Sequence, residues 1–154
     1  MPFARVSPKE AHALMEDEGY TYLDVRSIPE FERGHPQGAV NVPLLHFDAS
    51  RGGMVPNADF LAVVAANFPK DAKLVLGCKS GGRSMRAAQA LEQSGYLHLV
   101  DQRAGFDGGH DATGRVHEQG WLKEGLPVAT EAPLEARYDA MRARVMGRTL
   151  PPVR

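Results

Sequence analysis

The cysteine of this chain, Cys78, lies where an apolar segment gives way to a short loop rich in glycine and cationic residues. Residues 74–76, Leu-Val-Leu, are typical of a buried strand, and residues 85–91 have the spacing of a helix. A thiol between a strand end and a helix start faces unpaired backbone N–H groups and the positive end of the helix dipole. These groups stabilise the thiolate, which is the nucleophilic form of cysteine. The position predicts a cysteine that reacts or carries an anionic sulfur.

The six residues after Cys78 fit a loop that holds an anion. They are Lys79, Ser80, Gly81, Gly82, Arg83 and Ser84. The glycines allow the backbone to turn its N–H groups inward, and the two cations add positive charge. A lone cysteine is more often a small buried hydrophobe, but an inert cysteine does not require such neighbours. We therefore take Cys78 as the candidate catalytic residue and the six that follow as candidates for substrate binding.

Two motifs resemble those of rhodanese-like sulfurtransferases. The run Cys-Lys-Ser-Gly-Gly-Arg-Ser at 78–84 resembles the active-site loop of that family, in which cysteine opens a six-residue loop often closed by Arg-Ser. The second motif is Asp-Val-Arg at 24–26, Glu-Phe at 30–31 and Gly-His-Pro-Gln-Gly-Ala-Val-Asn-Val-Pro at 34–43. It is similar to the other family signature and lies upstream in the family's order. The resemblance covers roughly residues 3–128.

This resemblance implies a fold and a reaction. The fold is an α/β three-layer sandwich with a central, mostly parallel sheet of about five strands and helices on both faces. The reaction moves a sulfane sulfur from thiosulfate or a related donor to cyanide or a thiol through a persulfide on Cys78. Lys79 and Arg83 would attract the dianionic donor and stabilise the leaving sulfite. We expect no cofactor, and a protein could also serve as sulfur donor or acceptor. The six histidines are scattered without a metal-ligand pattern, so we also expect no metal site.

The order of predicted elements supports the same fold. Strands are expected at 3–6, 20–25, 40–42, 74–76 and 96–100, and helices at 8–18, 57–68 and 85–94, with a loop at 44–56. We expect Ser7 and Glu10 to form a capping box for the first helix and Asn57 to cap the second. Strands that alternate with helices favour a parallel sheet covered on both faces. Ligands of such sheets bind at the carboxyl ends of the strands. Cys78 falls at one of these ends.

The charged residues of the upstream motif are interpreted as structural. We expect Arg26 to bridge nearby carboxylates and His35 to bond backbone groups near the turn at Gly34. Asp24 ends a predicted strand and is a weaker candidate for the site. Two further cations, Arg86 and Arg103, could lie around the active site, although we favour solvated surface positions for both.

Two other functions use similar residues. Cysteine-dependent phosphatases and arsenate reductases also combine Cys and Arg, but their loops are typically one residue longer than the Cys-x4-Arg of Cys78 and Arg83. The shorter loop suits a single sulfur atom better than a phosphoryl group. A persulfide carrier that relays sulfur between proteins would need the same loop, and the sequence does not separate it from the enzyme.

The last third of the chain departs from the family pattern. A polar stretch from His110 to Gly120 separates Gly108-Gly109 from Trp121, and we expect a surface loop there rather than a lid or rim near the active site. Leu134, Tyr138, Met141 and Val145 recur at helical spacing. We expect a domain over residues 1–129 and an extension over 130–154, with a helix that packs on the domain or on a second subunit and a loose end around Pro151-Pro152.

The composition of the chain limits the classes of protein and of binding partner that remain. The chain has 154 residues, 43% hydrophobic and 24% charged, as expected for a single globular domain. A net charge of −1 gives no electrostatic case for binding nucleic acid or an anionic membrane. The lone cysteine excludes a disulfide within the chain, so a persulfide on it must be discharged by another molecule. No segment approaches membrane-spanning length, and we expect a reducing cytoplasm.

Overall fold

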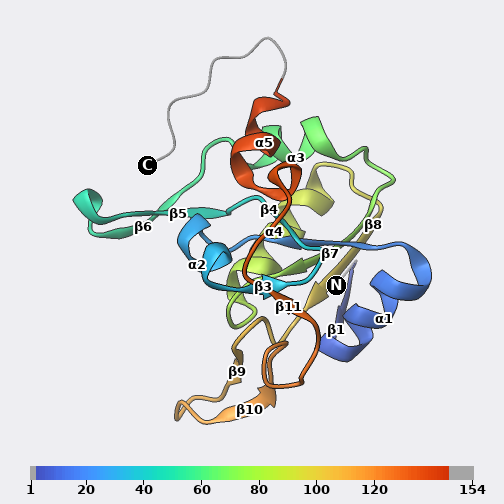
Figure 1. Cartoon of the computed structure of the whole chain (residues 1–154), viewed down its shortest axis with the longest axis vertical. Helices are drawn as coiled ribbons and strands as arrows, with labels where there is room; N and C mark the ends of the chain where they lie inside the picture. Colours follow the sequence, from blue (N-terminus) through green and yellow to red (C-terminus); the bar gives the residue numbers. More distant parts are fainter. Residues whose placement is uncertain (1–2, 146–154) are drawn as a thin grey trace.

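A five-stranded parallel sheet forms the centre of the computed structural model, which describes residues 3–145 (Figure 1). The strand order is β1-β8-β7-β2-β4, and each neighbouring pair is parallel. The bounds are Ala4–Val6 for β1, Thr21–Asp24 for β2, Val40–Asn41 for β4, Lys73–Gly77 for β7 and His98–Gln102 for β8. This confirms the predicted fold class, and it places the strand that precedes Cys78 at the middle of the sheet.

Helices cover both faces of the sheet because side chains along each strand alternate between them. Leu74 and Leu76 of β7 belong to a cluster with buried residues of α3 (Phe60–Asn67), α4 (Gly82–Gln93) and α5 (Tyr138–Ala143). Val75 points to the other face, where it joins a second cluster that contains Ala11 of α1 (Pro8–Glu18) and Trp121. The three predicted layers are therefore present.

The helix boundaries follow capping residues. Ser7 and Glu10 form the expected capping box of α1, and Gly19 ends that helix at a φ of +73°. In α2 (Ile28–Arg33), Glu30 accepts the N–H of Ser27. The prediction that Asn57 caps the next helix is wrong, because α3 begins at Phe60. The Asn57 side chain instead holds the preceding turn by accepting the N–H of Asp59 and donating to the Tyr138 hydroxyl.

The segment from 44 to 56, predicted to be a loop, is a β-hairpin. Strands β5 (Leu45–Asp48) and β6 (Gly53–Pro56) pair in antiparallel fashion around a 3-10 turn, η1 (Ala49–Arg51). The turn closes at Gly52, whose φ of +87° suits glycine. The two strands are defined by hydrogen bonds between residues on either side of the turn, and the pattern of residues within either segment alone does not predict that pairing. The hairpin projects from the body at the left of Figure 1.

The polar stretch near 110–120 lies at the surface as expected, but it belongs to a β-hairpin and is not an irregular loop. Strand β9 (Gly108–His110) pairs with β10 (Val116–Gln119), and the hairpin extends to the bottom of Figure 1. A shorter pair, β3 (His35–Pro36) and β11 (Val128–Ala129), joins the upstream motif to the end of the predicted domain.

The described part of the C-terminal extension packs into the main core. A 3-10 turn, η2 (Leu134–Ala136), leads into α5, and Tyr138, Met141 and Val145 are buried with residues of α3. Leu134 is 73% exposed and does not share this face. The boundary after residue 129 stays a proposal, and the expectation for Pro151-Pro152 lies outside the described residues. No helix within residues 3–145 is long and apolar enough to cross a membrane.

Candidate active site

Cys78 follows directly on the carboxyl end of β7, and close packing of the backbone fixes its position. Gly77 can carry no side chain, because a Cβ atom there would overlap the hydroxyl of Tyr22. The carbonyl of Cys78 accepts the N–H of Phe106 at 2.7 Å, and that of Lys79 accepts the N–H of Asp107 at 2.9 Å. The segment after β8 therefore clamps the start of the loop.

The loop turns back over the Cys78 sulfur at Gly81. The N–H of Gly81 donates to Sγ at 3.1 Å, at the start of α4. Gly81 has a φ of +105°, and a Cβ atom on it would lie 2.3 Å from the carbonyl oxygen of Arg103. Glycine is therefore required here on both conformational and steric grounds. The donated N–H and the helix dipole both favour negative charge on the sulfur.

A buried polar chain reaches the sulfur from the other side. The Ser84 hydroxyl lies 3.5 Å from Sγ and donates to the Asp101 carboxylate at 2.6 Å. Arg5 donates from Nε to the second oxygen of Asp101 at 2.8 Å. Burial raises the pKa of Asp101, although its bonds with Ser84 and Arg5 oppose that rise. Cys78 is thus linked through Ser84 to a carboxylate held by a cation.

Arg83 is engaged by a carboxylate. Its guanidinium donates to both oxygens of Glu30, at 2.7 and 3.0 Å, and both side chains are largely buried. Burial of Glu30 disfavours its charge, but the bonds from Arg83 and Ser27 outweigh this and lower the pKa of Glu30 to about 2. The pKa of Arg83 is correspondingly raised, chiefly by its bond with Glu30. Arg83 is therefore less available to an incoming anion than its sequence position indicates.

The other charged residues of the upstream motif are structural, as predicted. Arg26 donates to both oxygens of Asp24, and the pair is buried, so Asp24 is not free to enter the site. Burial disfavours the charge of Arg26, but Asp24 outweighs this and raises its pKa. The Nδ1 atom of His35 lies 2.7 Å from the carbonyl oxygen of Phe31, on whose ring the imidazole stacks.

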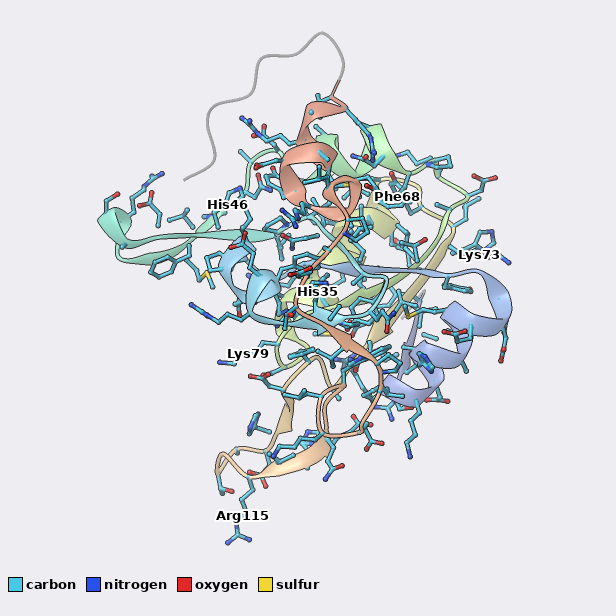
Figure 2. The ribbon with its side chains drawn as sticks, in the orientation of Figure 1. His35, His46, Phe68, Lys73, Lys79 and Arg115 are labelled. Carbon is cyan, nitrogen blue, oxygen red and sulfur yellow. The ribbon has the colours of Figure 1, made fainter. Side chains whose placement is uncertain are left out.

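The remaining loop residues face solvent. Lys79 is 58% exposed, projects from the body (Figure 2) and has one carboxylate oxygen of Asp107 at 4.0 Å. Gly82 has no neighbour within 4 Å of the place where a Cβ would stand. Ser80 lines a cavity beside the loop. Arg86 is exposed as favoured, whereas Arg103 is partly buried and bonds Glu118.

Sequence reasoning missed three residues around the loop: Arg5, Asp101 and Phe106. Asp101 was detectable in part, because it follows a predicted strand and carboxyl ends of parallel strands lie side by side. The observed register pairs Asp101 with Leu76, two residues before Cys78. Arg5 could not be found in this way, since its bond to Asp101 spans 96 positions. Within residues 3–145, His, Cys, Asp and Glu form no group of three that could hold a metal ion.

A cysteine at the carboxyl end of the central parallel strand, beside a glycine loop at a helix start, marks an α/β protein with a candidate active site at that edge of the sheet. Known sequences and structures identify the family. A sequence model of the rhodanese-like domain matches residues 7–112. The chain is 43% identical over 123 residues to thiosulfate sulfurtransferase 16, a chloroplastic protein of Arabidopsis thaliana, with 80% of this chain and 90% of that protein covered. The chain belongs to the rhodanese-like domain family.

Two further proteins are similar to this chain. The chain is 41% identical over 88 residues to the senescence-associated protein DIN1 of Raphanus sativus, which covers 57% of this chain. This chain spans only 47% of that relative's length. The crystal structure of Rv0390 from M. tuberculosis superposes with a TM-score of 0.66 at 27% identity, covering 83% of this chain and 98% of that one.

Proposed function

We propose that this protein is a sulfurtransferase that moves a sulfane sulfur from thiosulfate or a related donor to cyanide or a thiol. The observation that carries the proposal is the Cys78 sulfur at the carboxyl end of β7, with the Gly81 N–H 3.1 Å away at the start of α4. A thiolate at such a place is both nucleophilic and able to keep a second sulfur atom. The name of the Arabidopsis relative supports the same reaction.

The first half-reaction loads the enzyme. The thiolate of Cys78 attacks the outer sulfur of thiosulfate, a new S–S bond forms, and the S–S bond of the donor breaks. The electron pair of the broken bond leaves with sulfite, so no oxidant or reductant is needed. Backbone N–H groups at the start of α4 hold the negative charge of the resulting persulfide. Lys79, exposed at the loop edge, attracts the dianionic donor.

The second half-reaction discharges the enzyme. Cyanide or a thiolate attacks the outer sulfur of the persulfide, and the electron pair of the broken bond returns to Cys78 as a thiolate. The N–H of Gly81, which donates to Sγ at 3.1 Å, stabilises that charge, and the Ser84 hydroxyl accepts from the Cys78 thiol in the resting state while it donates to Asp101. Arg83 contributes by holding Glu30 and so fixing the first turn of α4 against α2. The reaction suits a reducing compartment such as the cytoplasm, where a lone thiol stays reduced.

The position of Arg83 favours sulfur over phosphoryl transfer. A phosphatase needs a guanidinium that can clamp phosphate oxygens, but both arms of Arg83 already bond Glu30. Together with the short Cys-x4-Arg spacing, this arrangement leaves the loop suited to a single sulfur. We therefore expect no turnover of aryl phosphates.

Steady-state kinetics test this function. With thiosulfate and cyanide, the wild-type protein should form thiocyanate with double-reciprocal plots that are parallel, as expected for a two-step exchange. An aryl phosphate should remain intact under the same conditions. Hydrolysis of the phosphate without thiocyanate would reject the proposal. Slow thiocyanate formation with rapid loading from a protein persulfide would instead identify a sulfur carrier.

A further inference from the structure

A cavity of about 400 Å³ opens beside the catalytic loop, and the β9–β10 hairpin forms much of its wall. Ser80 connects it to the loop. The remaining lining residues come from β1, the turn after β8 and the hairpin: Arg5, Arg103, Gly109, His110, His117 and Glu118. Its volume lies in the range of small-molecule sites. Thiosulfate has five non-hydrogen atoms and cyanide two, so neither needs a space of this size.

A β-bulge brings both His117 and Glu118 to the wall of this cavity. Consecutive residues of a regular strand point to opposite faces. Here the register shifts between Val116 and Glu118, and His117 is the residue at the irregularity. Such bulges re-aim a side chain. The His117 ring lies over Gly109, where an added Cβ would approach to within 2.9 Å of the imidazole. The hairpin is therefore shaped to place this ring.

Arg103 holds the hairpin in place. Its guanidinium donates to both oxygens of Glu118, at 3.0 and 2.8 Å, and to the carbonyl oxygen of Arg5 at 3.1 Å. Three segments, β1, the turn after β8 and β10, are thus tied together. The cavity is formed by fixed elements, and no movement of the hairpin is needed to build it.

The wall of the cavity favours an anionic group. Glu118 forms an ion pair with Arg103, and Arg5 forms one with Asp101 through its Nε atom. Asp101 is buried and does not line the cavity, whereas Arg5 does. The Nη2 atom of Arg5 lies beside the loop, 3.4 Å from the place where a Cβ on Gly81 would stand. The imidazoles of His110 and His117 add further donors. His110 also borders a neighbouring cavity of about 390 Å³ whose wall contains Lys79 and Lys123.

We propose that this cavity binds the carboxylate end of a small acidic thiol, which is the sulfur acceptor of the reaction. This inference rests on the proposed function. The cavity contacts the loop at Ser80 and not at Cys78, so it suits the part of a substrate remote from the reacting sulfur. With its carboxylates in the cavity, the acceptor reaches the persulfide with its own thiolate. A new S–S bond forms to the outer sulfur, the bond to Cys78 breaks, and the electron pair returns to Cys78.

The experiment compares two thiol acceptors of similar size, mercaptosuccinate with two carboxylates and neutral thioglycerol. Wild-type enzyme loaded by thiosulfate should show a lower KM for mercaptosuccinate. The double variant His110→Ala/His117→Ala, which removes both donors, should raise that KM about fivefold, the size expected for lost bonds to a partly exposed anion. Its KM for thioglycerol and its thiocyanate formation from cyanide should not change. Gly109→Ala, which displaces the His117 ring, should have the same effect.

Two matched variants show whether the effect is specific to the cavity. One removes a positive charge elsewhere on the hairpin, and the other removes a histidine elsewhere on the surface. Arg115 projects into solvent from the tip of the same hairpin (Figure 2), and Arg115→Gln should leave both KM values unchanged. His98 is exposed at the start of β8, remote from the loop, and His98→Ala should also have no effect. Thermal unfolding of each variant shows whether the fold is kept.

The inference fails if the two thiols have equal KM values with the wild type, or if the double variant keeps the preference. It also fails if the double variant slows loading by thiosulfate, since the cavity would then serve the donor. Calorimetric titration of the resting enzyme with mercaptosuccinate provides a separate readout. If the wild type binds mercaptosuccinate and the double variant does not, the cavity assignment is supported whether or not the enzyme forms thiocyanate. If the wild type binds mercaptosuccinate but forms no thiocyanate, the proposed function is rejected and the cavity assignment is kept.

Discussion

Glu30 and Arg83 lie 53 positions apart and form an ion pair between α2 and α4. Both side chains are held on rigid elements, and both oxygens of the carboxylate are bonded. Such bidentate pairs are stronger than single contacts. At the residue scale, Arg83, which the sequence motif assigns to substrate binding, thus also joins α4 to α2 beside the candidate site.

This pair predicts a pH dependence of stability. The pKa of Glu30 is lowered from 4.5 to about 2, so its contribution is complete above pH 4.5 and disappears as the pH falls toward 2. Glu30→Gln should lower the free energy of unfolding by about 2 kcal/mol at pH 7, after allowance for partial exposure. At pH 3 the difference from wild type should be about half as large. Urea unfolding at both pH values measures it.

Glu32→Gln is the control for this prediction, because Glu32 is exposed on the same helix. It removes the same charge and should change the free energy of unfolding by less than about 0.5 kcal/mol. An equal loss in the two variants, or a Glu30→Gln effect that does not depend on pH, would show that the pair contributes nothing specific.

Individual residues were predictable from sequence where their role is local. Cys78 and the loop glycines follow from a strand, a loop and a helix that are contiguous in the chain. The pairing of Arg26 with a carboxylate was predictable because Asp24 is two positions away. The partners of Arg83 and Asp101 were not predictable, since they depend on which strands and helices become neighbours.

At the scale of elements, the loop after Cys78 is shaped by two adjacent glycines with different roles. Gly81 has a positive φ and packs against the carbonyl of Arg103, whereas Gly82 begins α4 and has open space around it. The N–H that contacts the Cys78 sulfur belongs to Gly81. The geometry of the loop therefore depends on the first glycine and tolerates change at the second.

Alanine at each position tests this difference. Gly81→Ala should cost about 2 kcal/mol of stability through strain at a positive φ, and it should slow persulfide formation by at least about tenfold because the loop must move. Gly82→Ala should fold as well as wild type or slightly better, because alanine is the better helix former, and it should load at the normal rate. Rapid-quench loading with thiosulfate measures both. Similar loading rates for the two variants would contradict the assigned geometry.

The elements predicted least well are the two hairpins. The alternation of strands and helices in the main sheet gives a periodic signal, and that sheet was predicted in number and direction. The β5–β6 and β9–β10 pairs are short, glycine-rich and partly exposed, so hydrophobic periodicity is weak in them. Their strands are defined by pairing with each other, and a propensity analysis cannot supply that information.

At the scale of the whole molecule, the C-terminal extension contributes to the same core cluster as Cys78. Tyr138 is buried among the residues that cover the same face of the sheet as Leu76, and its hydroxyl accepts a hydrogen bond from Asn57. The extension is joined to the domain by this contact and by the packing of α5 on α3. Residues 130–145 therefore support the domain that holds Cys78.

Substitution of Tyr138 tests this contribution. Tyr138→Ala should lower the free energy of unfolding by about 3 kcal/mol, the usual cost of removing a buried aromatic ring. Leu134→Ala, at an exposed position of the same extension, should cost less than about 0.5 kcal/mol. Chemical denaturation compares the two variants. A stable Tyr138→Ala protein would indicate that the extension packs only loosely on the domain.

Intact mass spectrometry after incubation with thiosulfate tests the central claim most directly. The wild-type protein should gain the mass of one sulfur atom and lose it on addition of cyanide, with thiocyanate released. Cys78→Ser, which preserves the fold but lacks the thiol, should show no gain. A wild-type protein that stays at its original mass with every sulfur donor, or a Cys78→Ser protein that gains sulfur, would contradict transfer through Cys78.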